Sequence, residues 1–127
     1  MATTRKQDAL RFDQKVVRGD RFYRSYAFRN DEEVPIDISG FSFQGKIKET
    51  FGSADSIDFI ISKAQSDEAL ALGIVADTVI INLPGPSTNN VEAGSYVYDI
   101  QKVMDSDPDF VETFLRGNFF ILPEVTR

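Results

Sequence analysis

The titratable side chains limit the chemistry that this chain can perform. It holds 20 Asp plus Glu and 14 Lys plus Arg, but no Cys and no His. A thiol nucleophile, a Ser-His-Asp relay, a disulfide framework and a zinc site built on thiolate and imidazole ligands are therefore all excluded. Carboxylate, lysine, tyrosine and hydroxyl chemistry remains.

Three acids at alternating positions have the spacing with which a calcium-binding loop begins. They are Asp105, Asp107 and Asp109, and carboxylate oxygens suit that ion. The rest of such a loop is missing, because Pro108 occupies its middle and Arg116 stands where the closing Glu would be. We interpret the segment as a solvated turn between strands, and we expect no metal and no cofactor.

A pair of carboxylates could carry out glycosidase-type acid and base catalysis. The acid that we expect nearest the core is Asp99, because Tyr98 and Ile100 flank it in an apolar strand. A buried carboxylate is more often held by an Arg or a backbone group than catalytic. We expect no enzyme activity, and a small carboxylate-based hydrolase is the alternative.

The charges are unevenly distributed along the chain. Residues 1–30 hold eight basic and three acidic side chains, a balance of +5, whereas the remaining 97 hold six and 17, a balance of -11. This split predicts a basic surface that contacts an acidic surface of another subunit. The interface residues that we predict are Arg5, Lys6, Arg11, Arg18, Arg21, Arg29 and Arg127.

The basic residues also allow two other interpretations. Clustered Arg side chains could neutralise nucleic-acid phosphates, but the acidic remainder would repel a polyanion, so we do not expect nucleic acid as a partner. Arg18-Gly19-Asp20 spells an integrin-binding tripeptide. Gly-Asp is also a common hairpin signal, and we interpret the tripeptide as a turn.

The elements that must position these residues are mostly strands, because apolar side chains recur at every second position. Turn residues at 105–109 and at Arg116-Gly117-Asn118 predict a C-terminal meander of two hairpins. We expect the first and last strands at sheet edges. The predicted strands cover residues 10–16, 22–28, 41–47, 57–61, 79–83, 95–103, 110–115 and 119–125.

These strands predict an all-β fold: a single immunoglobulin-like or jelly-roll-like β-sandwich of about eight antiparallel strands. The 11 Phe and four Tyr residues suit the space between two sheets. We place the sandwich at residues 10–127 and an extended N-terminal arm at residues 1–9. Short helical turns are expected at Asp67–Leu72 and Ser87–Glu92.

The chain shows no pattern of a membrane or secreted protein. Its uncharged apolar runs, such as Val79 to Leu83, are far shorter than the roughly 20 residues of a membrane helix. The segment after Met1 is polar and charged, unlike a signal peptide. We expect a protein made in a cytoplasm, without a membrane partner.

An ordered set of motifs resembles the small β-sandwich domains of tailed-phage virion proteins. The set is similar to the N-terminal domain of phage baseplate upper proteins and to related tail, neck and head-fibre anchoring domains. The motifs are Gly19-Asp20, Val34-Pro35-Ile36-Asp37-Ile38-Ser39-Gly40-Phe41, Ile80-Ile81-Asn82-Leu83-Pro84, Ala93-Gly94-Ser95-Tyr96-Val97-Tyr98-Asp99-Ile100, Leu115-Arg116-Gly117-Asn118-Phe119-Phe120-Ile121 and Val125-Thr126-Arg127.

The resemblance implies a structural component of a bacteriophage virion, in the tail, baseplate or neck. Its expected partners are copies of itself and other phage structural proteins, its expected location is the virion, and it would be made in the bacterial host cytoplasm. A small-molecule ligand is not expected. The alternative is a carbohydrate- or receptor-binding module of a phage tail or fibre, for which Tyr23, Tyr96 and Tyr98 are the candidate residues, although the chain has no Trp.

Overall fold

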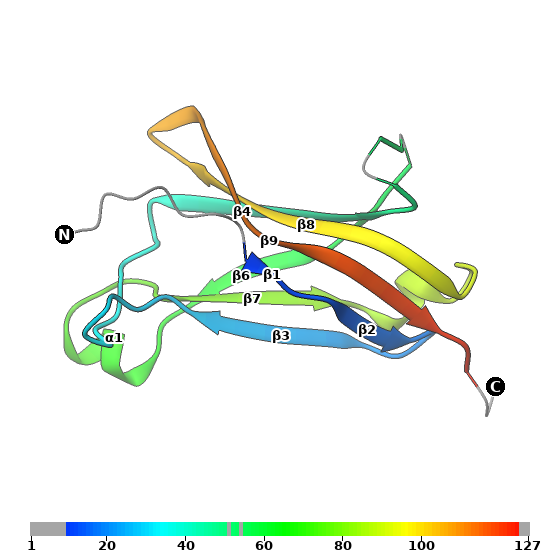
Figure 1. Cartoon of the computed structure of the whole chain (residues 1–127). Coiled ribbons are helices and arrows are strands. Elements are labelled where there is room, and N and C mark those ends of the chain that lie inside the picture. Colours follow the sequence, from blue (N-terminus) through cyan, green and yellow to red (C-terminus); the bar gives the residue numbers. More distant parts are fainter. Residues whose placement is uncertain (1–9, 51, 54, 125–127) are drawn as a thin grey trace.

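Two β-sheets packed face to face form the body of the molecule (Figure 1). The computed structural model describes residues 10–50, 52–53 and 55–124. The predicted all-β sandwich is confirmed. The predicted arm at residues 1–9, with Arg5 and Lys6, and the predicted interface residue Arg127 lie outside the described residues.

The larger sheet, here called sheet A, has its strands in the order β1-β9-β8-β4-β5, with β2 also paired to β9. Its strands β4, β8 and β9 lie uppermost in Figure 1. Strands β8 and β9 form a long antiparallel hairpin at its centre. The bounds are β1 Leu10–Arg11, β2 Gln14–Val17, β4 Phe41–Lys48, β5 Ile57–Asp58, β8 Gly94–Met104 and β9 Asp107–Leu122.

The smaller sheet, here called sheet B, contains three antiparallel strands in the order β3-β7-β6. They are β3 Phe22–Ala27, β7 Thr78–Leu83 and β6 Ile60–Ala64. Helix α1, Asp67–Ala71, confirms the first predicted helical turn, and a 3₁₀ turn at Gly85–Thr88 begins two residues before the second. Neither of these helices in the described part of the chain is long and apolar enough to cross a membrane.

The alternating apolar residues of both sheets meet in one core. Phe119 lies at its centre, with its ring centroid 5.1 Å from that of Phe22, 5.8 Å from Phe59 and 6.0 Å from Tyr98. Burying a large apolar side chain contributes about 1.5–3 kcal/mol. The other buried apolar residues of the strands include Val16, Ile47, Val79, Ile81, Leu83, Ile100, Leu115 and Ile121.

The predicted second hairpin of the C-terminal meander is wrong, because β9 runs unbroken through Gly117. A side chain at this position would collide with the backbone of the N-terminal segment, since a Cβ on Gly117 would lie 2.5 Å from the carbonyl oxygen of Phe12. Glycine therefore permits a close backbone approach inside a strand here rather than a turn. The remaining turn, at Asp105-Ser106, joins β8 to β9.

The N-terminal strands also differ from the prediction of antiparallel pairing, because β1 and β2 run parallel to β9. Phe12 and Asp13 interrupt them, and the side chain of Phe12 is 55% exposed despite its apolar spacing. As predicted, this first stretch lies at a sheet edge. The last strand does not, because β9 lies between β8 and the β1 and β2 pair.

Candidate functional site

The outer surface of sheet A is positively charged in a chain whose net charge is -6. The alternation that directs Ile47, Ile100 and Leu115 into the core directs charged neighbours outward. The outward side chains include five bases and two acids, a balance of +3. We call this surface the basic face; its charged residues are Arg11, Lys15, Lys46, Lys48, Arg116, Asp58 and Asp99.

A row of charges crosses the basic face from strand to strand. In register, Asp58 lies opposite Lys46, Lys46 opposite Asp99, Asp99 opposite Arg116, and Arg116 opposite Arg11. Lys46 Nζ lies 2.9 Å from Asp58 Oδ1, and this hydrogen bond holds the pKa of Asp58 below its ordinary value. The row therefore ends in excess positive charge on the β1 side.

Asp99 is half-buried on this outer face, so the prediction that it lies near the core is wrong. Its neighbours Tyr98 and Ile100 occupy the core instead, because successive side chains point to opposite sides of the sheet. Burial raises the pKa of Asp99, although the charges of Lys48 and Arg116 offset part of that effect.

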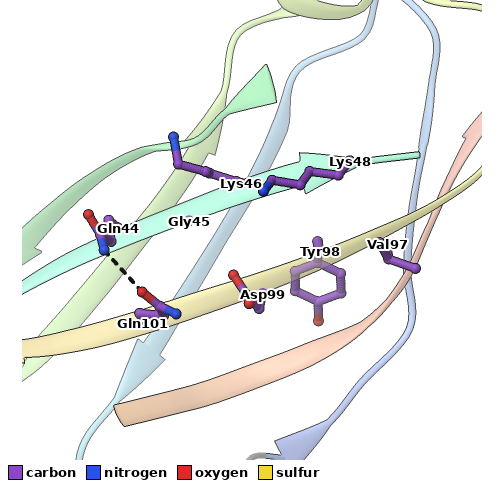
Figure 2. Close-up of a pocket in the computed structure, with 8 residues that line it drawn as sticks. All are labelled: Gln44, Gly45, Lys46, Lys48, Val97, Tyr98, Asp99 and Gln101. Atoms are coloured by element: carbon purple, nitrogen blue, oxygen red, sulfur yellow. Dashed lines mark hydrogen bonds between the residues drawn. The ribbon is translucent and has the colours of Figure 1, made fainter. Parts of the chain in front are cut away.

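A pocket of about 250 Å³ hollows the basic face between β4 and β8 (Figure 2). Lys46 and Lys48 extend from β4, Asp99 extends from β8, and Gln44 Nε2 donates a 3.0 Å hydrogen bond to Gln101 Oε1. Ammonium and amide donors of this kind suit a carboxylate from a partner. The lining residues are Gln44, Gly45, Lys46, Lys48, Val97, Tyr98, Asp99 and Gln101.

A second pocket, of about 300 Å³, is lined by more acids than bases. Its lining includes the acids Glu49, Asp55 and Glu92 beside Tyr96. Burial is the main cause that raises the pKa of Tyr96, and the negative charges of Glu49 and Glu92 add to it. The Tyr96 hydroxyl donates a hydrogen bond to the backbone oxygen of Glu92. Within residues 10–50, 52–53 and 55–124, no group of three or more acids is arranged to hold a metal ion.

The predicted interface residues that the structure describes do not share one surface. Arg11 lies on the basic face, whereas Arg21 directly precedes β3 and its Nε donates to Asn82 Oδ1 of β7 at 2.9 Å. Arg18 forms a 3.0 Å ion pair with Glu124. Arg29 forms 3.1 Å ion pairs with Glu68 and Asp77. Sequence reasoning missed the lysines of β2 and β4, because their shared face appears only once the strand register is known.

Among the acids of the described residues, Asp77 is the one that is completely buried, and sequence reasoning also missed it. Its carboxylate accepts hydrogen bonds from the Ser66 amide at 2.9 Å, the Ser66 hydroxyl at 2.7 Å and the Thr78 hydroxyl at 3.1 Å. Burial alone would raise the pKa of Asp77, but these bonds and Arg29 outweigh it and lower the pKa. Asp77 thus joins the start of α1 to β7, which is a structural role.

The tripeptide Arg18-Gly19-Asp20 forms the predicted turn, with Gly19 at φ 88° and its amide donating to Thr88 Oγ1 at 2.8 Å. The turn predicted at residues 105–109 is shorter in the structure, because only Asp105 and Ser106 form it and β9 begins at Asp107. Ser42 Oγ donates to Asp105 Oδ1 at 2.6 Å.

Of the tyrosines considered for sugar binding, Tyr98 is buried and Tyr96 is half-buried. Tyr23 is 44% exposed. The Arg21 guanidinium lies over the Tyr23 ring, 4.5 Å from its centroid.

No protein-family model and no curated protein sequence matches the chain. Among solved structures it is similar to a family 123 glycoside hydrolase from Clostridium perfringens, with a TM-score of 0.42 and 15% sequence identity. The match covers 96% of this chain and 24% of that enzyme chain. A likeness this low carries no argument about the activity of this chain.

Proposed function

We propose that this chain is a non-enzymatic structural component of a bacteriophage virion, placed in the tail, baseplate or neck. It acts by self-assembly or by docking to other virion proteins. The motif resemblance to phage β-sandwich domains supports the virion assignment. The sandwich supplies a rigid body with broad sheet surfaces, which suits a building block.

The observation that carries the assembly role is the concentration of positive charge on the basic face of an acidic chain. The basic face has a balance of +3 while the whole chain carries -6, so the rest of the chain carries -9. Complementary surfaces of this kind orient protein partners and speed their encounter. Both signs within one chain allow identical copies to attract each other.

Peptide mass spectrometry of purified particles tests the virion assignment. Particles from a culture in which this gene is expressed should be banded by density and washed in high salt. We expect peptides of this chain at a fixed ratio to the other tail or neck proteins across the particle band. Recovery only in the unbanded lysate would overturn the proposal.

A further inference from the structure

We propose that the basic face of one copy binds the tip of the β8–β9 hairpin of a second copy. The tip is residues 105–111. This inference rests on the proposed function and deepens it, because it names the surfaces through which copies assemble. The partner is thus a second copy of this chain rather than a nucleic acid.

The hairpin tip has the form of an inserting element. The turn that joins β8 and β9 projects beyond the rest of sheet A at the upper left of Figure 1. Every residue of the tip is exposed, and Phe110 and Val111 are 42% and 50% exposed despite their apolar side chains. Apolar groups at a protruding tip are typical of a segment that a partner covers.

The charge of the tip complements the charge of the basic face. Residues 105–111 contain Asp105, Asp107 and Asp109 and no basic residue, a balance of -3 against the +3 of the face. Asp105 accepts a hydrogen bond from the Ser42 hydroxyl, and Asp107 and Asp109 are exposed acids of the tip. Among the described residues, neither of these two forms a salt bridge.

The basic face can accept both parts of the tip. In the described part of the chain, Lys15 and Lys48 have no carboxylate within salt-bridge distance, and Lys48 lines the 250 Å³ pocket. Val97 and Phe120 also point outward on this face, opposite the Lys48 and Lys15 positions respectively. The tip carries two acids, Asp107 and Asp109, followed by two apolar residues. The basic face offers ammonium groups for the acids and neighbouring apolar side chains for the apolar residues.

The geometry requires two copies. The tip and the centre of the basic face lie along the same β8 and β9 strands, and continuous strands cannot fold back onto their own surface. The contact therefore joins the hairpin tip of one copy to the basic face of another copy. Head-to-tail contacts of this type produce rings when the rotation closes and filaments when it does not.

Complementary charge reversal tests the contact. The face variant is Lys48→Glu, with Lys15→Glu as a second version in case the first fails to fold; the tip variant is Asp107→Lys with Asp109→Lys. The matched control reverses two exposed acids elsewhere, Asp31→Lys with Glu32→Lys. Circular dichroism checks that each protein is folded, and sedimentation velocity measures self-association at low salt and at about 1 M salt, where the Debye length is about 3 Å.

We expect the wild type and the control to associate at low salt and to dissociate in high salt. Each reversed variant alone should associate about tenfold or more weakly, because like charges then face each other. An equal mixture of face and tip variants should form a heterodimer, because it restores one acidic tip against one basic face.

A folded wild type that stays monomeric, or reversed variants that associate as well as the wild type, would overturn the inference. A second contradicting result is that the wild type binds a single-stranded oligonucleotide, and that Lys48→Glu loses this binding while its self-association is unchanged. A polyanion would then be the occupant of the basic face. The chain could be found in particles while the pure protein stays monomeric. In that case this inference fails and the proposed function stands.

Discussion

The hydroxyl of Tyr98 donates a hydrogen bond to the backbone carbonyl of Phe12. Tyr98 lies in β8 at the core, and Phe12 lies in the break between β1 and β2, so the bond ties the N-terminal segment across β9 to the strand beyond it. Gly117 of β9 lies directly opposite Tyr98 and leaves room for this approach.

Replacing Tyr98 with Phe should destabilise the fold by about 1–3 kcal/mol, because the Phe12 carbonyl loses its hydroxyl partner inside the protein. Urea denaturation at pH 7 measures the loss. Tyr23→Phe is the control, since that ring is 44% exposed and its change should have little effect. Equal effects of the two changes would contradict the role assigned to Tyr98.

The same hydroxyl predicts a loss of stability in alkali. Burial raises the pKa of Tyr98 from 10.0 to about 12. The folded state therefore holds this proton more tightly, so its contribution is complete below pH 10.0 and is lost as the pH rises toward about 12. Tyr98→Phe should show a shallower decline in the free energy of unfolding over that range. An unchanged slope would contradict the assignment.

Replacing Gly117 with Ala should cost about 1–3 kcal/mol through overpacking. The added Cβ would approach the Phe12 carbonyl oxygen to 2.5 Å, and backbone cannot move aside as a flexible side chain can. Gly94→Ala in β8 is the matched control, because nothing lies within 4 Å of its Cβ position. Thermal denaturation of both variants measures the difference, and comparable melting temperatures would show that the close approach is not a constraint.

Replacing Asp77 with Asn should lower the melting temperature at pH 7 by about 5–15 °C, because charge-assisted hydrogen bonds to Ser66 and Arg29 are weakened. The lowered pKa of Asp77 means that its stabilisation is present above 3.8 and is lost as the pH falls through the folded-state value. The variant should therefore lose less stability on acidification than the wild type. Asp31→Asn, at an exposed position in a turn, is the matched control and should melt as the wild type does at pH 7.

Replacing Asp99 with Asn should have the opposite effect at neutral pH. The pKa of Asp99 is raised, so folding favours its protonated form and the ionised group reduces stability as the pH rises above 3.8. The variant should unfold at higher urea concentration at pH 7, and the difference should shrink toward pH 3. A less stable variant at pH 7 would mean that the attraction of Lys48 and Arg116 outweighs the cost of burial.

The sheets could be predicted from the sequence because strand periodicity is local. Val79, Ile81 and Leu83 recur at every second position, between Thr78, Ile80 and Asn82, and all three are buried as the spacing indicates. Gly117 could not be interpreted correctly, because a glycine that makes a turn and one that admits a neighbouring backbone look identical in sequence. Only the position of Phe12, 105 residues away, decides between them.

The candidate site was harder to predict because the strand register creates it. Arg11, Lys46, Asp99 and Arg116 come from four strands, and the parallel pairing of β1 with β9 places the first beside the last. The uneven charge of the sequence predicted a basic surface from residues 1–30, whereas Lys46, Lys48 and Arg116 of the basic face come from the acidic remainder. Its position depended on which side of sheet A each lysine and arginine faces.

Gold labelling of intact particles tests the central claim most directly. An epitope-tagged copy of the chain should be incorporated during infection, and the labelled particles examined by negative-stain electron microscopy. The account predicts gold at one fixed position on the tail, baseplate or neck. Particles without label, from cells that contain the folded tagged protein, would contradict it.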